Sequence, residues 1–420
     1  MRNLPGGTAR RRDCVPIQPR RAEPHLWRQW SRPQEIRRRK HLDRGDRAEF
    51  VQIEIFVRSA QIVGRECGPA DRLRVAPVRI ILYQRIMTLI QHLSRRLLHG
   101  ALSALCFGLP APASAFELPD WSITNLRDHP LVGTVWDANG VETTLGALAE
   151  RIRAADHVAI GEIHINADHH RIQAAILDML AADGRKPSVV FEMIPERLGG
   201  ELQAFQREHP SNAAGLGDRL EWTQRGWPDW SIYRPIAEAA LRHGLTMAAG
   251  DLDRTLIRAI GKGGSAALEP ARRQRYRLDR PLDPQTERAL RKTLDEGHCG
   301  LLPQAALAPM LTVQRARDGA LADAMISANN PDGTVLIAGA GHVRRDWGAP
   351  AVLMQRTQDK QVLAIALFEV GKDRDRLQDY PLEEGGAIPF DFVVFTPRAE
   401  TGDPCAGLKE RFKGKPPVKD

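Results

Sequence analysis

Residues 157–164 read HVAIGEIH and combine an apolar run with a glycine, a glutamate and a histidine. An apolar run of this length, without polar alternation, is typical of a strand buried on both faces of a parallel sheet. The segments SVVFEM (188–193) and TVLIAGAGH (334–342) are similarly apolar. We therefore expect strands at 157–162, 188–193 and 334–338, with glycine or polar residues at their carboxyl ends.

Helices are expected between these strands, and each has a capping residue or a proline near its start. They run from Asp168 to about Ala182, from Pro235 to His243, from Pro284 to Gly297 and from Pro309 to about Ala328. Further strands are expected at 245–249, 361–370 and 392–396. This order predicts an α/β fold, with a mostly parallel sheet, helices on both of its faces and a helical insertion at about 252–330.

The positive charge of the chain is concentrated at its front. The 420 residues carry a formal net charge of +8, from 60 Lys and Arg and 52 Asp and Glu. Residues 1–86 hold 20 basic and 9 acidic residues, whereas residues 116–420 carry a net charge of −5. The basic character therefore gives no support for nucleic-acid binding, and we expect no nucleic-acid partner.

Residues 87–115 have the pattern of a secretory signal peptide that begins at Met87. Arg95 and Arg96 precede an apolar run of thirteen residues (97–109), and Ala113-Ser114-Ala115 forms a cleavage pattern. Thirteen apolar residues are too few to span a bilayer, so we expect no transmembrane helix in the mature protein. Cleavage near Ala115 predicts a periplasmic or secreted protein, and both the general and the twin-arginine export routes stay open.

A signal peptide does not start 86 residues into a chain, so we interpret residues 1–86 as disordered upstream sequence translated from a start codon chosen too early. The alternative is a genuine basic appendage, which would make residues 87–115 a membrane anchor. Residues 116–420 suffice for a single α/β domain with a core at about 130–370. Leu105 precedes Cys106, so we expect no lipoprotein anchor. Whether Cys299 and Cys405 pair stays open.

Polar residues end several of the expected strands. Ligands of an open parallel sheet bind at the carboxyl ends of its strands. We expect Glu162 and His164 from the first strand, Glu192 from the second, and His342 after the strand at 334–338, to converge there. Such a set can bind a divalent transition metal, with Glu162 or Glu192 as the general base of a hydrolase. The alternative for each histidine is a hydrogen-bonded structural role.

Other candidates lie on the expected helices and loops. His170 lies in a first helical turn, where free N–H groups attract carboxylates or phosphates. Three tryptophans between residues 222 and 230 precede Tyr233 and form either a flat apolar wall for a planar ligand or a small core under a loop. Arg317 either faces the crevice or lies on a solvated helix face.

These motifs resemble those of the ChaN-type haem-binding proteins, whose wider group includes Tiki-type metal-dependent proteases and erythromycin-esterase-like enzymes. The resembling segments follow one order over roughly residues 130–370 and are GEIH (161–164), DHH (168–170), FEM (191–193), YRPI (233–236), HC (298–299), Gln314 with Arg317-Asp318, and GAGHVR (339–344). The resemblance implies an exported α/β protein that binds haem at the strand ends, as a homodimer sandwiching haem, and serves haem or iron uptake or storage.

The resemblance also implies a tyrosinate as the iron ligand, and residues 116–420 offer Tyr233, Tyr276 and Tyr380. Tyr233 lies in a matching motif, while Tyr276 lies among arginines that suit haem propionates. Two functions stay open: a haem carrier or storage protein, and a metal-dependent hydrolase of protease or esterase type. A third is a scaffold that keeps the site without using it. The motif order favours haem, with His170 and Arg317 as further contacts.

Overall fold

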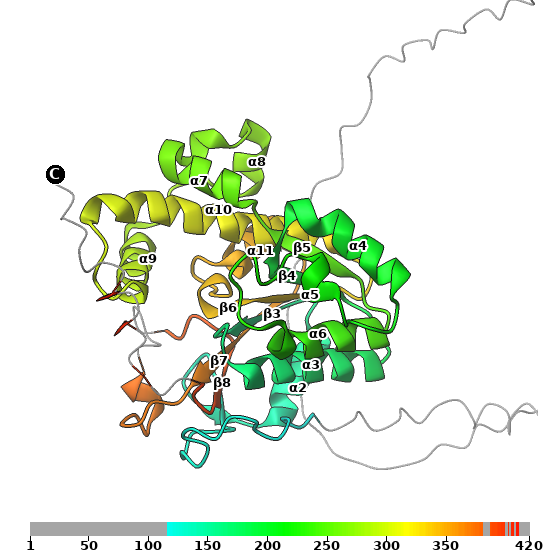
Figure 1. Ribbon diagram of the computed structural model, residues 1–420. Coiled ribbons are helices and arrows are strands. Elements are labelled where there is room, and N and C mark those ends of the chain that lie inside the picture. Colours follow the sequence, from blue (N-terminus) through cyan, green and yellow to red (C-terminus); the bar gives the residue numbers. More distant parts are fainter. Residues whose placement is uncertain (1–115, 381–386, 400–401, 403–404, 407–408, 411–420) are drawn as a thin grey trace, which may run out of the picture. The chain divides into compact units, whose positions relative to one another are not determined.

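The computed structural model describes residues 116–380, 387–399, 402, 405–406 and 409–410 (Figure 1). The expectations for residues 1–86 and 87–115 lie outside this part of the chain. An eight-stranded sheet forms its centre, in the order β2-β1-β8-β7-β3-β6-β4-β5. The strands are β1 (Val135–Asp137), β2 (Glu142–Thr143), β3 (His157–Glu162), β4 (Ser188–Pro195), β5 (Met247–Asp251), β6 (Thr334–Gly339), β7 (Val362–Glu369) and β8 (Phe392–Thr396).

The sheet is mostly parallel, as predicted. Strand β3 pairs in parallel with β6 and β7, and β4, β5 and β8 continue the parallel part on both sides. Only β1 is antiparallel to its neighbours β2 and β8. The bounds of β3 and β8 are those expected from the sequence. Strands β1 and β2 were not expected, because segments of three and two residues are too short to show a periodic pattern.

Helices cover both faces of the sheet, which confirms the α/β fold (Figure 1). The α-helices are α2 (Leu145–Ala154), α3 (Ala167–Ala182), α4 (Gly199–Glu208), α5 (Leu216–Arg219), α6 (Trp230–Arg242), α7 (Arg254–Gly263), α8 (Pro270–Arg275), α9 (Pro284–Gly297), α10 (Gln304–Ala328) and α11 (Ala349–Arg356). Short 3₁₀ helices are η1 (Glu196–Leu198), η2 (Gly264–Ala267), η3 (Ala340–His342) and η4 (Leu377–Asp379). Helices α7 to α10 form the expected helical insertion.

Alternate side chains of the strands supply two separate cores. Val158 and Ile160 of β3 pack with α2, α3 and α6 on one face of the sheet. Ala159, between them, packs on the other face with Leu321 of α10 and Leu353 of α11. This alternation follows from the two-residue period of a strand. Because β3 is buried on both faces, its run is continuously apolar until Gly161.

Three helices begin before the expected residue. Asn166, not Asp168, caps α3, and its side chain accepts hydrogen bonds from the next free N–H groups. Asp229 caps α6 in the same way, so Pro235 lies inside that helix and not at its start. Pro309 likewise lies inside α10. An internal proline removes one backbone hydrogen bond, which the packing of the buried face of each helix offsets.

A disulfide joins Cys299 and Cys405, whose Cα atoms are 5.8 Å apart. Cys299 follows α9, so the bridge ties the turn between α9 and α10 to a segment that follows β8. The sequence left this pairing open. In the described part of the chain, no helix has both the length and the apolar composition needed to cross a membrane.

Candidate functional site

Glu162, the last residue of β3, is the centre of a group of four side chains, of which three are buried. Its Oε1 accepts a hydrogen bond from the Tyr233 hydroxyl at 2.6 Å and lies 2.8 Å from Nδ1 of His164. Its Oε2 lies 3.1 Å from Nε2 of His170, whose ring packs on that of Tyr233 with centroids 3.9 Å apart. We call Glu162, His164, His170 and Tyr233 the Glu162 group.

Glu192 of β4 is the centre of a second group at the same sheet edge. Its Oε1 accepts a hydrogen bond from Arg317 of α10 at 2.7 Å and lies 3.4 Å from Nε2 of His342. Its Oε2 accepts from the Gly339 N–H at 2.7 Å. Arg317 also donates to both carboxylate oxygens of Asp251, at 2.6 to 3.1 Å. We call Glu192, Arg317, Asp251 and His342 the Glu192 group.

Helix α10 fixes the orientation of His342. The Nδ1 atom of His342 lies 2.6 Å from Oδ1 of Asp318 and 3.0 Å from the Gln314 amide nitrogen. Asp318 is fully buried, and its Oδ2 has no hydrogen-bond partner among the described residues. His342 is therefore held by a buried carboxylate on one side and faces Glu192 on the other.

Glycines bring the two groups together. The Nε2 atom of His164 lies 4.0 Å from Oε2 of Glu192. A Cβ atom on Gly339 would lie 3.1 Å from the same His164 nitrogen, so glycine leaves room for the imidazole. A Cβ on Gly161 would lie 2.4 Å from the Val343 side chain, so the turn after β6 packs directly on β3. Both Gly-x-x-His segments thus need glycine for close approach.

The two glutamates are held as carboxylates. Burial alone would raise the pKa of Glu162, but His170 and His164 outweigh it and keep that pKa well below its usual range. Burial also opposes ionisation of Glu192, yet His342, Arg317 and His164 lower its pKa to about 2. The side chains of both glutamates are therefore negatively charged at neutral pH.

The neighbouring groups respond to these charges. Burial and the Glu162 carboxylate raise the pKa of Tyr233, which keeps its hydroxyl protonated as a donor. The pKa values of His164 and His342 are raised, because their carboxylate partners outweigh burial. Burial raises the pKa of Asp318 to about 6, and His342 opposes that shift.

The convergence predicted for His164, His342, Glu162 and Glu192 occurs, but as two hydrogen-bonded groups. Within the residues that the structure describes, no three His, Cys, Asp or Glu side chains are grouped so as to hold a metal ion. Arg317 pairs with Glu192, Tyr233 donates to Oε1 of Glu162, and His170 lies at ion-pair distance from Oε2 of Glu162. The metal site expected from the sequence stays a prediction.

A cavity of about 410 Å³ lies next to these groups. Its apolar lining comes from Met193, Pro195, Trp227, Leu252 and Ile257, and its charged lining from Glu192, Arg197, Glu221, Arg225, Asp251, Arg254 and Arg317. The Trp227 ring contacts the His164 ring, with centroids 5.0 Å apart. The His164 side chain is 34% exposed, whereas the rest of the Glu162 group is buried. His164 is therefore the member of that group that is presented toward solvent.

The predicted aromatic cluster divides between the core and this cavity. Trp222 and Tyr233 are fully buried, and their rings pack edge to face with centroids 4.8 Å apart. Trp227 lines the cavity instead. Tyr276 belongs to neither group: it is 2% exposed and packs against Gly319. The Tyr380 hydroxyl binds the backbone of Gly371 and Arg374. No tyrosine in the described part of the chain is exposed.

Three cations of the cavity, Arg197, Arg225 and Arg254, were not selected from the sequence. They follow β4, α5 and β5 respectively and share no motif, so no local signal marks them. Arg225 is notable because its Nη2 atom is buried without a hydrogen-bond partner among the described residues, while its Nη1 donates to the Met193 carbonyl. Burial lowers the pKa of Arg225 to about 10.

Comparison with known proteins relates this architecture to one family. Residues 148–353 match the family model described as haem-binding uptake, Tiki superfamily, ChaN. A ChaN of Campylobacter jejuni, described with cofacial haem binding, is 18% identical with a TM-score of 0.47, covering 62% of this chain and 95% of that chain. An erythromycin esterase mutant in its open conformation is 14% identical with a TM-score of 0.32, covering 62% and 82%. No curated protein matches the chain.

Proposed function

Because the chain belongs, through residues 148–353, to the haem-binding uptake family ChaN of the Tiki superfamily, we propose that it binds haem and serves haem or iron uptake or storage. The observation that carries the proposal is the cavity of about 410 Å³ that is lined by Glu192, Arg317 and Trp227, whose ring contacts that of His164. Its volume falls within the range of about 300 to 1,000 Å³ that is usual for small-molecule sites. Its lining combines the apolar and cationic groups that an amphipathic anion such as haem requires.

The cavity residues fit the two chemical parts of haem. Trp227, Met193 and Leu252 supply an apolar wall for the macrocycle. Arg225 supplies a guanidinium nitrogen that lacks a partner, and a propionate carboxylate would satisfy it. Arg254, exposed at the cavity lining, adds a second cation. A buried donor without a partner is costly, so a carboxylate ligand at Arg225 removes an existing penalty.

We assign the iron contact to His164. Its Nδ1 faces Glu162 at 2.8 Å, and a neutral imidazole that donates there has a lone pair on Nε2 for a ligand, so iron binding would displace the proton that the raised pKa favours. Tyr233, the ligand implied by the family resemblance, donates its hydroxyl to Glu162 and is 1% exposed. Tyr233 is the alternative ligand, and it would have to leave Glu162 and lose its proton. Tyr276 lies outside both groups.

We further propose that the protein is exported and that cleavage occurs near Ala115. The Cys299–Cys405 disulfide supports this proposal, since such bridges persist in oxidising compartments and are rare in the cytosol. A homodimer that sandwiches haem is part of the same proposal, and the stoichiometry of haem binding tests it.

A second candidate is a hydrolase of protease or esterase type. It is favoured by one observation: the His164 imidazole is oriented by the Glu162 carboxylate at 2.8 Å, as a general base is in hydrolytic sites. In this function His164 takes a proton from water, and Glu162 stabilises the imidazolium that forms. The same residue therefore serves both candidates, with different ligands at Nε2.

Haemin titration, followed by absorbance in the Soret region, tests the proposal. We expect saturable binding by the wild-type protein, and an altered spectrum with at least about tenfold weaker binding in His164→Ala. Arg225→Gln should weaken binding about tenfold without altering the spectrum, because it removes one charge-assisted hydrogen bond. Arg242→Gln, which changes an arginine of α6 that pairs with Asp178 of α3, is the matched control and should bind as the wild type does.

The variants separate the candidate ligands and functions. A spectrum lost in Tyr233→Phe and kept in His164→Ala would assign the iron to Tyr233. No saturable binding by folded wild-type protein would contradict haem binding and leave the hydrolase as the remaining candidate. Hydrolysis would then be sought with ester and peptide substrates, and His164→Ala should abolish it.

A further inference from the structure

A second cavity, of about 60 Å³, lies beside α10 and shares no lining residue with the first. The residue of α10 that lines it is Arg315, two positions before Arg317 of the Glu192 group. Residues two apart on a helix point to nearly opposite sides. Helix α10 thus directs one arginine to each of the two cavities.

The two arginines differ in their counter-ions. Arg317 pairs with the carboxylates of both Glu192 and Asp251. Arg315 instead donates to two backbone carbonyl oxygens, those of Arg277 and Arg280, at 3.0 and 2.6 Å. Within the described part of the chain, no carboxylate lies within ion-pair distance of Arg315. Arg315 is half-buried, and a half-buried charge without a counter-ion is unfavourable.

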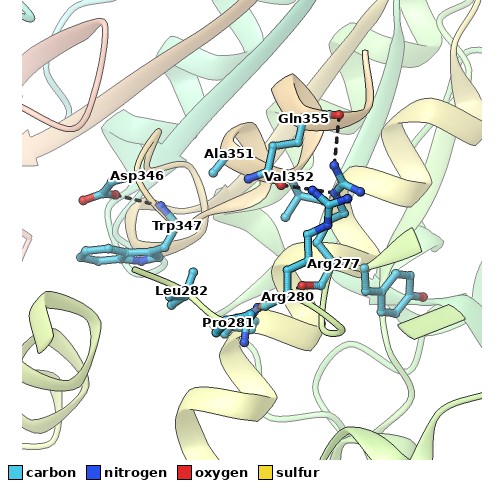
Figure 2. Close-up of a pocket in the computed structure, with 11 residues that line it drawn as sticks. Arg277, Arg280, Pro281, Leu282, Asp346, Trp347, Ala351, Val352 and Gln355 are labelled. Atoms are coloured by element: carbon cyan, nitrogen blue, oxygen red, sulfur yellow. Dashed lines mark hydrogen bonds between the residues drawn. The ribbon is translucent and has the colours of Figure 1, made fainter. Parts of the chain in front are cut away.

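Two more guanidinium groups line the same cavity. Arg277 and Arg280 lie together on the loop after α8, and Arg277 faces Gln355 of α11 (Figure 2). Arg277 donates to the Gln355 side chain at 3.2 Å. The exposed Arg280 side chain forms no hydrogen bond or ion pair with the residues that the structure describes. None of these three arginines forms an ion pair within the part of the chain that the structure describes.

The carboxylate in the lining does not neutralise these cations. Asp346 accepts two hydrogen bonds from Arg344, at 3.0 and 2.7 Å, and a third from the Trp347 N–H. More distant carboxylates, including Asp318 and Glu287, act on Arg315 from beyond ion-pair distance, and burial still lowers the pKa of Arg315. The balance of charge at the cavity stays positive.

We propose that this cavity binds a small oxyanionic group, a carboxylate or a phosphate, between Arg315, Arg277 and Arg280. Guanidinium groups match both anions through paired N–H donors. A volume of about 60 Å³ is that of about two waters, which suits one such group and is too small to enclose a nucleotide or haem. Leu282, Trp347 and Val352 add apolar contacts for a short organic carboxylate. The inference does not depend on haem binding.

Calorimetric titration of the wild-type protein with inorganic phosphate, and separately with acetate, tests the proposal at pH 7 and constant ionic strength held with sodium chloride. We expect saturable binding of one anion per chain for at least one of the two, and the preferred anion distinguishes phosphate from carboxylate ligands. Constant ionic strength separates site binding from general screening of surface charge.

Charge-removing variants locate the binding. Arg280→Gln should weaken it about tenfold, and Arg315→Gln should abolish it. Arg280→Gln is decisive, because its side chain makes no hydrogen bond whose loss could unfold the protein, whereas Arg315 holds two carbonyls. Arg242→Gln is the control and should leave binding unchanged. The proposal is overturned if neither anion gives saturable heat, or if Arg280→Gln binds as tightly as the control does.

Discussion

The two Gly-x-x-His segments, 161–164 and 339–342, end neighbouring parallel strands, yet the structure uses them differently. The side chain of His164 is 34% exposed, whereas that of His342 is 7% exposed. His164 is oriented by Glu162, which belongs to its own segment. His342 is oriented by Asp318, which comes from α10, 24 positions earlier in the chain. The first segment presents an imidazole, and the second helps to hold Glu192.

The difference follows from the residues between the glycine and the histidine. In the first segment they are Glu162 and Ile163, so the strand supplies its own carboxylate. In the second segment they are Ala340 and Gly341, which carry no polar side chain. The second histidine must therefore find its partners on other elements. The same spacing of glycine and histidine therefore exposes the imidazole of His164 in the first segment, and places the imidazole of His342 against Glu192 in the second.

The largest expected effect comes from removing the support of the second histidine. Asp318→Ala leaves His342 buried without its carboxylate, and we expect the free energy of unfolding to fall by about 3 to 5 kcal/mol. His164→Ala, at the exposed histidine, should cost about 1 kcal/mol or less. Urea denaturation measures both. Equal losses in the two variants would contradict the distinction between the segments.

The glycines of the two segments provide the next test. A Cβ on Gly161 would lie 2.4 Å from Val343 and 2.8 Å from the Ala340 Cα atom, whereas a Cβ on Gly341 would meet nothing within 4 Å. We expect Gly161→Ala to destabilise the protein by up to about 3 kcal/mol through overpacking, and Gly341→Ala to stay within about 0.5 kcal/mol of the wild type. Thermal unfolding of both variants measures these losses. A larger loss in Gly341→Ala than in Gly161→Ala would contradict the close approach of Gly161 to Val343 and Ala340.

The smallest expected effect concerns pH and His169, which follows the first segment. His169 is fully buried between the Ile163 N–H and the Thr396 hydroxyl, and burial lowers its pKa to about 3. Its neutral form therefore stabilises the protein above about pH 6.5, and this contribution is lost as the pH falls toward 3. We expect the stability advantage of wild type over His169→Gln to shrink by about 2 kcal/mol between pH 7 and pH 5.

The comparison with His169→Gln is needed because Asp318 acts in the opposite direction. Its pKa of about 6 exceeds that of an unfolded aspartate, so its contribution to stability is lost as the pH rises from about 4 to 6. This contribution is common to both proteins and cancels in their difference. Guanidinium chloride titrations at the two pH values give that difference, and an advantage that does not depend on pH would exclude a neutral buried His169.

The parallel core could be predicted because burial on both faces leaves a direct trace in the sequence. The runs 157–162 and 392–396 coincide with β3 and β8. The predicted helix starts were less accurate. The residues that cap α3 and α6 are Asn166 and Asp229, but Asp168 and Pro235, which come later in the sequence, are also typical of a helix start. The short strands β1 and β2 form because β1 pairs with both β2 and β8. Pairing with β8, which lies far away in the sequence, leaves no pattern in the residues of β1 itself.

The sequence predicted where the residues of the candidate site lie, but not which side chains form hydrogen bonds with one another. Strand ends correctly marked Glu162, His164, Glu192 and His342 as neighbours at one edge. The sequence could not show that Arg317 would bridge Glu192 and Asp251, because that contact joins residues 66 and 125 positions apart from Arg317. It also could not show that the Tyr233 hydroxyl points to Glu162 and away from solvent.

The bridge between Cys299 and Cys405 gives the molecule a mechanical property. It encloses α10, β6, α11, β7 and β8, and with them the second Gly-x-x-His segment, in a covalent ring closed between cysteines 106 positions apart in the sequence. If the chain is pulled from points outside the ring, the segment between the two cysteines cannot extend. The extended length of the unfolded chain is then shorter by about 350 Å. Force then passes through the two sulfur atoms, and it can stretch the first Gly-x-x-His segment while the backbone of the second bears no tension.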